Sequence, residues 1–178
     1  MAELPWSSAT VALAELRPWR QVGLRLRQPF PAYLAGISLS LTANRVAATG
    51  PLRVLWLAPD EWLVVAEGEA PDLLPRLERA VAGRRAALND LSSSRAIIEL
   101  RGAGARDLVA AGCGLDLHPR AFAPGHCAQT LLARVPVILD QIDAEPHYRL
   151  LVRRSYVRWL VDWLIDAAGG LGAASGQR

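Results

Sequence analysis

The chain has 178 residues, of which 52% are hydrophobic, and a formal net charge of +3; this length suits one well-buried core and is short for two. No apolar run is long enough to cross a bilayer, the N-terminus lacks a signal-peptide pattern, and two cysteines are too few for a disulfide framework. All 20 basic residues are arginines, scattered among 17 acids rather than gathered with aromatic residues. We therefore expect a cytoplasmic protein with reduced thiols, no nucleic-acid partner and no membrane association.

Alternation of apolar and polar residues, or a short apolar run between turn residues, predicts the strands. In chain order, the predicted strands are 21–27, 37–42, 52–58, 62–67, 94–101, 127–134, 137–143 and 148–153. The third and fourth strands are separated by Pro59-Asp60-Glu61 and are expected to form a tight hairpin. The sixth and seventh are expected to form a second hairpin around Pro136. The stretch between 42 and 51 is expected to be a loop.

Three segments have the apolar spacing of helices, 71–83, 105–111 and 155–168, and 32–36 has room for about one helical turn. Pro71 suits a first helical turn and Gly83 a helix end. The last helix has so broad an apolar surface that we expect heavy burial. Residues 1–168 are expected to form a single domain, and residues 169–178 a flexible C-terminal tail.

Parts of the first half of the chain overlay its centre when the sequence is shifted by 74 to 76 residues. Glu15-Leu16 falls on Asp90-Leu91, Arg20 on Arg95, and Leu26-Arg27 on Leu100-Arg101. Each half also ends with a strand followed by a helix. The sequence therefore predicts an α+β fold of two similar strand-helix-strand halves that share one core.

The segment around Gly102 and Gly104 resembles the start of a dinucleotide-binding loop, but Asp107 occupies the place of the third glycine. A carboxylate at that place repels phosphate, so a packed strand-to-helix turn is favoured. Neither cysteine has a nucleophile signature. A zinc set of Cys113, His118, His126 and Cys127 matches no common spacing. We expect no catalytic, cofactor-binding or metal-binding residue in this chain.

Two segments are candidates for contacts with a ligand or with another subunit. Asp116, His118 and Arg120 alternate in charge just before Phe122, and Arg120 could hold a carboxylate with its guanidinium. A salt-bridge cluster at a subunit contact is the alternative that we favour over a ligand site. In the last helix, Trp159 and Trp163 could fill the core or anchor an interface.

Three stretches of the chain carry a family resemblance: LWLAPDEWLVV (55–65), the long segment from Asp90 to Arg134, and YRLLVRRSYVRWLVDWLIDAA (148–168). In this order they resemble the gamma subunit of heterotetrameric sarcosine oxidase. The region before Leu52 matches less well. Ala58 departs from the family, which more often has glycine before Pro-Asp-Glu-Trp.

The resemblance implies a fold similar to the folate-binding domain of the glycine-cleavage aminomethyltransferases. It also implies partners, namely alpha, beta and delta subunits that together demethylate sarcosine to glycine. The complex can pass the one-carbon unit to tetrahydrofolate and releases hydrogen peroxide. FAD and FMN lie with beta, NAD and the folate site with alpha, and zinc with delta, so no cofactor and no catalytic residue is implied in this chain.

Two hypotheses follow from these observations. The first is a non-catalytic subunit of a flavin-dependent secondary-amine oxidase, which takes part in one-carbon metabolism only through its partners. The second is a stand-alone folate-binding protein of one-carbon transfer, for which Asp90, Glu99 and Asp116 are the acids that could hold a pterin.

Overall fold

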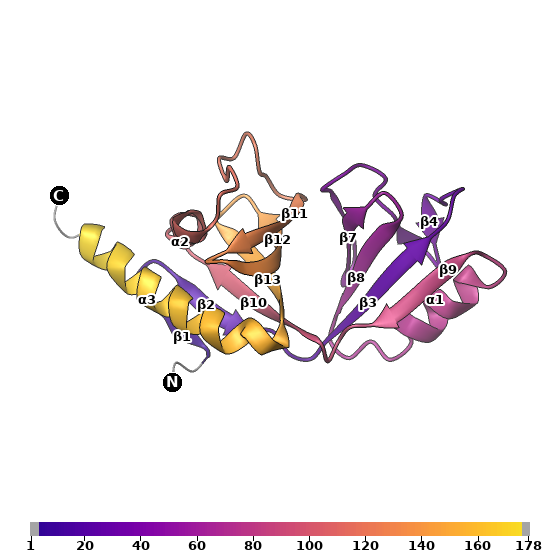
Figure 1. Cartoon of the computed structure of the whole chain (residues 1–178), viewed down its shortest axis with the longest axis horizontal. Helices are drawn as coiled ribbons and strands as arrows, with labels where there is room; N and C mark the ends of the chain where they lie inside the picture. The colour runs from indigo at the N-terminus through magenta and orange to yellow at the C-terminus, as the bar shows by residue number, and fades with distance from the viewer. Residues whose placement is uncertain (1–3, 176–178) are drawn as a thin grey trace. The chain divides into compact units, whose positions relative to one another are not determined.

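The computed structural model describes the backbone of residues 4–175 and has the predicted α+β fold (Figure 1). The strands are β1 Trp6–Ser7, β2 Ala12–Glu15, β3 Trp19–Leu26, β4 Tyr33–Leu34, β5 Ile37–Ser38, β6 Val46–Thr49, β7 Leu52–Ala58, β8 Glu61–Glu67, β9 Ala86–Asp90, β10 Arg95–Arg101, β11 Cys127–Leu132, β12 Val135–Asp143 and β13 His147–Arg153. The helices are α1 Leu73–Val81, α2 Ala105–Gly112 and α3 Val157–Ser175, and a 3-10 turn, η1 Arg154–Tyr156, precedes α3.

The chain divides into two compact units whose segments alternate along the sequence. The first unit contains the residues up to 16, residues 95–124 and the residues from 128 onward, and the second contains 17–94 and 125–127. The first unit has a sheet in the order β1-β2-β10-β13-β12-β11, and the second has one in the order β6-β7-β8-β3-β9. Neither unit is a continuous segment, so neither could be separated by a single cut.

The two sheets have the same internal order and confirm the repeat that the sequence predicted. Strand β2 continues into β3 but pairs with β10, whereas β9 continues into β10 but pairs with β3. Glu15 lies opposite Ile98, and Asp90 lies opposite Val22. Each half thus contributes one strand to the sheet of the other half. The two exchanged strands, β2 and β9, lie at positions that the sequence offset relates.

Each unit buries one face of its own sheet under its own helices. In the first unit, alternate residues of β10 and β13, such as Leu100 and Leu150, pack with residues of α2 and α3. In the second unit, Trp62 and Val64 of β8 pack with Leu73 and Leu77 of α1. Where we expected one core shared by the halves, the structure has two hydrophobic clusters. The reason is local, because the helix that follows β8 or β13 folds back onto the sheet containing that strand.

Several element boundaries differ from the sequence prediction. The expected helical turn at 32–36 is a hairpin of β4 and β5, because Ala35 and Gly36 both have positive φ, as a two-residue hairpin turn requires. Strand β6 lies in the expected loop. Strand β9 was not predicted, since Ala-Ala-Leu-Asn has little intrinsic strand preference and pairing with β3 decides its conformation.

Helix α3 extends beyond the expected domain boundary at Ala168. Helix α3 continues through Gly169 and Gly170 to Ser175, and only 176–178 of the expected tail lie outside the described residues. Glycine disfavours a helix by about 1 kcal/mol relative to alanine but does not stop one that is already packed. Among the helices in the described part of the chain, none combines the length and apolarity needed to cross a membrane.

Candidate functional site

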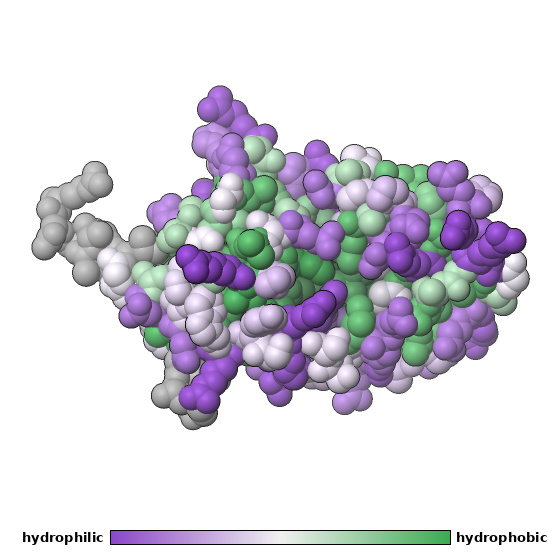
Figure 2. Space-filling view, in the orientation of Figure 1, coloured by the Kyte–Doolittle hydropathy of each residue, from purple (hydrophilic) through white to green (hydrophobic). Residues whose placement is uncertain are grey.

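The charged residues predicted in the 116–122 segment do lie together in the loop that joins α2 to β11. This loop projects from the first unit, and hydrophilic residues cover its tip (Figures 1 and 2). Asp116 Oδ1 accepts the backbone N–H of His118 at 2.9 Å, and His118 Nδ1 accepts that of Arg120 at 3.2 Å. All three residues are exposed. Two of the three side chains therefore shape the turn, and the loop presents a mixed-charge surface.

The apolar candidates divide between core and surface. Phe122 is 4% exposed and belongs to the core cluster of the first unit, so its side chain anchors the loop. Trp163 is half-buried against the same cluster. Trp159 is 51% exposed. The sequence could not assign these three residues to the core or to an interface, because large aromatic side chains occur in both.

We expect Trp163→Ala to destabilise the isolated chain by about 2 to 4 kcal/mol, a little below the range for fully buried aromatic residues. The indole of Trp163 lies over Gly112, where an added Cβ would come within 2.5 Å of ring atom Cη2. Urea unfolding of both proteins measures the difference. Trp159→Ala is the matched control on the same helix and should change the free energy of unfolding by less than about 1 kcal/mol, as surface substitutions do. Equal effects of the two substitutions would contradict the assignment of Trp163 to the core and Trp159 to the surface.

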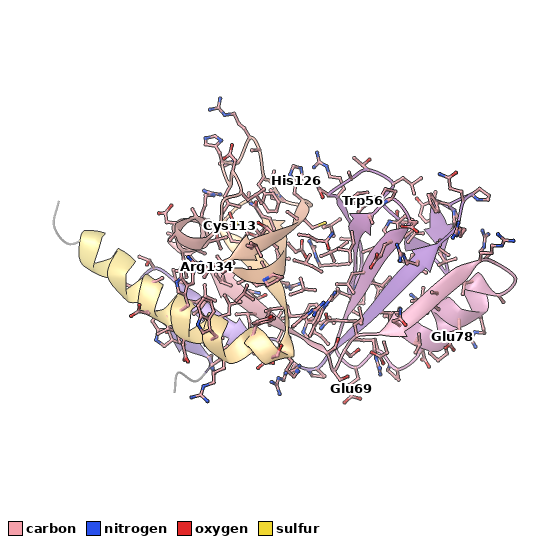
Figure 3. All side chains as sticks on the ribbon, in the orientation of Figure 1. Trp56, Glu69, Glu78, Cys113, His126 and Arg134 are labelled. Atoms are coloured by element: carbon pink, nitrogen blue, oxygen red, sulfur yellow. The ribbon has the colours of Figure 1, made fainter. Side chains whose placement is uncertain are left out.

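The two cysteines are unbridged and buried, and Figure 3 labels the side chain of Cys113. Cys113, at the end of α2, has its Sγ 3.5 Å from Thr130 Oγ1. Cys127 Sγ donates to the carbonyl oxygens of Trp56 at 3.5 Å and Arg45 at 3.8 Å. The described residues contain no group of three or more His, Cys, Asp and Glu that could hold a metal ion.

The densest charged cluster in the first unit centres on Glu99, which sequence reasoning had considered only as a possible pterin ligand. Glu99 Oε1 lies 2.9 Å from His147 Nε2 and 3.4 Å from Arg149 Nε, and Oε2 lies 2.9 Å from Arg101 Nε. His147 Nδ1 lies 2.9 Å from Asp143 Oδ2. In the β10–β13 pair, Glu99 is opposite Arg149 and Arg101 is opposite His147. Only this register brings the four side chains together.

The chemistry of the cluster is that of a satisfied buried network. Burial opposes ionisation of Glu99, but hydrogen bonds from Arg101 and His147 outweigh it and lower the pKa of the Glu99 carboxyl. The hydrogen bond to Glu99 likewise raises the pKa of Arg101. Both ring nitrogens of His147 lie within hydrogen-bonding distance of carboxylate oxygens, Nδ1 of Asp143 and Nε2 of Glu99. Both oxygens of Glu99 are thus engaged within the chain.

Acidification should weaken this network. Because the pKa of Glu99 is lower in the folded than in the unfolded chain, its stabilising contribution is complete above the ordinary carboxyl pKa, about 4.3, and is lost as the pH falls through the folded value. We expect the melting temperature of the wild type to fall more steeply below about pH 4.3 than that of Glu99→Gln, which has no titrating carboxyl there. Thermal unfolding at a series of pH values measures both curves. Parallel curves would contradict the stabilising role of the ionised Glu99 carboxylate.

Asp90, the second acid considered, stabilises the start of the segment that joins β9 to β10. Its Oδ1 accepts the hydroxyl of Ser92 at 2.6 Å and the backbone N–H of Ser92 at 3.0 Å, and its Oδ2 lies 2.6 Å from Arg20 Nη1. The hydrogen bonds from Ser92, with that from Arg20, lower the pKa of the Asp90 carboxyl. Like Glu99, Asp90 has both carboxylate oxygens engaged by hydrogen bonds within the chain.

Comparison with known proteins decides the family. The sequence profile of the sarcosine oxidase, gamma subunit family matches residues 31–170. The chain belongs to this family. The sarcosine oxidase subunit gamma of Corynebacterium sp. strain U-96 is 36% identical over 170 residues, which cover 92% of this chain and 82% of that protein. That of strain P-1 is 34% identical over 167 residues, which cover 90% and 81%.

Solved structures agree with the fold expected for a gamma subunit. A chain of the heterotetrameric sarcosine oxidase from Corynebacterium sp. U-96, in complex with pyrrole 2-carboxylate, superposes with a TM-score of 0.84 at 36% identity, covering 90% of this chain and 84% of that one. The glycine cleavage aminomethyltransferase of Bartonella henselae gives 0.66 at 16% identity, covering 88% and 46%. The second likeness shows the fold alone and confirms the predicted kinship of folds.

Proposed function

We propose that this chain is a non-catalytic gamma subunit that assembles with alpha, beta and delta subunits into a heterotetrameric sarcosine oxidase of the cytoplasm. The complex oxidatively demethylates sarcosine to glycine, transfers the one-carbon unit to tetrahydrofolate and releases hydrogen peroxide. FAD, FMN, NAD, the folate and zinc are held by the partner subunits. The observation that carries the proposal is the likeness over nearly the full length of both chains to one chain of a heterotetrameric enzyme.

The state of the chain's own acids supports a structural role. Glu99 is in contact with the side chains of Arg101, His147 and Arg149, and Asp90 accepts from Ser92 and Arg20. Asp116 caps the turn at His118. The acids that a folate-binding function would need to hold a pterin are therefore already occupied, which favours the subunit over the stand-alone folate-binding protein.

Two exposed surfaces of the first unit are the proposed partner contacts. One consists of Tyr156 and Trp159, which are large aromatic side chains open to solvent on η1 and α3. The other is the loop surface with Asp116, His118 and Arg120. Exposed tryptophan and arginine residues are enriched among the side chains that dominate binding energies.

Co-expression with candidate alpha, beta and delta chains, followed by affinity purification on this chain, tests the proposal. We expect recovery of all four chains with bound flavin. Recovery of this chain alone, folded and monomeric, with every partner present would refute it.

Trp159→Ala should reduce recovery of the partners while leaving the melting temperature of the isolated chain unchanged. Titration of the isolated chain with tetrahydrofolate should show no saturable binding, and tight binding would favour the folate-binding alternative.

A further inference from the structure

The outer edge of strand β2 in the first unit is covered by the short strand β1. Trp6 lies opposite Leu13 and Ser7 opposite Ala12, and the N–H of Ser8 donates to the carbonyl of Val11 at 2.8 Å. Strand β1 runs antiparallel to β2. Leu13 is 1% exposed, and Trp6 packs against the core cluster to which Leu13 belongs.

The equivalent strand of the second unit is β9, and within residues 4–175 no further strand pairs with its outer edge (Figure 1). The backbone N–H of Leu91 donates to the carbonyl of Gln21, and the N–H of Arg27 donates to the carbonyl of Arg85. The backbone N–H and C=O groups of the odd-numbered residues of β9 therefore point toward β3. The backbone groups of Ala86 and Leu88 point the other way. By the repeat, Leu88 corresponds to Leu13, and it is half-buried.

A basic hollow adjoins this open edge. A cavity of about 380 Å³ is lined by Arg25, Arg27, Asp60 and Arg85, together with the first residues of β9. Arg25 lies 3.5 Å from Asp60 Oδ1. Arg27 and Arg85 are exposed, and within the described part of the chain neither is joined to an acid. The hollow thus carries uncompensated positive charge, which favours carboxylate-bearing partners.

We infer that β9 receives an extended acidic segment of another subunit, which pairs antiparallel with it as β1 pairs with β2. The segment places an apolar side chain opposite Leu88, in the way that Trp6 lies opposite Leu13. Carboxylates follow that residue and lie beside Arg27 and Arg85. Main-chain hydrogen bonds supply affinity in such strand addition, and the side-chain contacts supply specificity. This inference rests on the proposed assembly.

Amide hydrogen exchange of the isolated chain and of the purified complex tests the inference directly. In the isolated chain, the amides of Ala87 and Asn89 should exchange slowly, because they face β3, and those of Ala86 and Leu88 should exchange fast. In the complex, the amides of Ala86 and Leu88 should slow by about tenfold or more. Unchanged exchange at these two amides in a complex that has formed would overturn the inference and leave the proposed function standing. Failure of the wild-type chain to form any complex would refute both. Slowing that depends on the concentration of the isolated chain would point to a second copy and would also overturn it.

Substitutions give an independent arm. Ala86→Pro removes an outward N–H at an edge position where proline is tolerated, and Ala86→Val is the control that keeps the N–H. The proline variant should lower recovery of partner chains about tenfold relative to the valine variant, at equal melting temperature of the isolated chains. Arg27→Glu with Arg85→Glu should also lower recovery, whereas the corresponding Gln variants should lower it less. Full recovery with both the proline and the glutamate variants would overturn the inference.

Discussion

Replacing Glu99 with alanine should lower the free energy of unfolding by about 3 to 5 kcal/mol, the range found when one partner of a buried ion pair is removed. The carboxylate is the common acceptor for Arg101, His147 and Arg149. Without it, the largely buried side chains of His147 and Arg149 lose a hydrogen-bond acceptor while remaining shielded from water. Urea unfolding followed by tryptophan fluorescence measures the change.

The control for this prediction lies in the same cluster. Arg101 is 59% exposed, so its ion pair with Glu99 is screened by solvent, and Arg101→Ala should destabilise by no more than about 1 kcal/mol. If the two alanine variants were equally stable, the cluster would not be organised around a buried carboxylate, and the structural role assigned to Glu99 would fail.

Gly102→Ala should destabilise the chain by roughly 3 to 5 kcal/mol, from backbone strain and overpacking together. Gly102 has a φ of +115°, and an added Cβ would lie 2.3 Å from the carbonyl oxygen of Thr10. That same oxygen accepts the N–H of Gly104 at 3.1 Å. The backbone of the β1–β2 turn therefore has no room to move away without losing its hydrogen bond.

Gly114→Ala is the matched control, because its φ is ordinary and nothing lies within 4 Å of an added Cβ. It should change the free energy of unfolding by less than about 0.5 kcal/mol. Chemical denaturation of the two variants compares them. A Gly102→Ala chain as stable as wild type would contradict the close approach of Thr10, and with it the packing reason for the glycine pair.

The glycine pair shows how far a motif can be interpreted from sequence. The sequence predicted a strand, a turn and a helix around Gly102 and Gly104, and the structure has β10, the turn and α2 at that place. The sequence could not indicate what approaches Gly102, because the contact comes from Thr10, far away along the chain. Phe122 gives the same lesson, since its assignment to surface or core depends on how its loop packs.

By itself, the sequence determined the features of this protein that depend on local periodicity and on repetition. These are the α+β class, the two hairpins, the helices after β8 and β13, the internal repeat and the family, whose signature residues lie in continuous stretches. Only the tertiary structure decided the exchange of β2 and β9 between the halves, the division into two cores, the charged cluster around Glu99 and the open edge of β9. Each of these depends on which strands pair and in which register, and pairing between distant segments is set by the packing of whole sheets rather than by the residues next to one another in the chain.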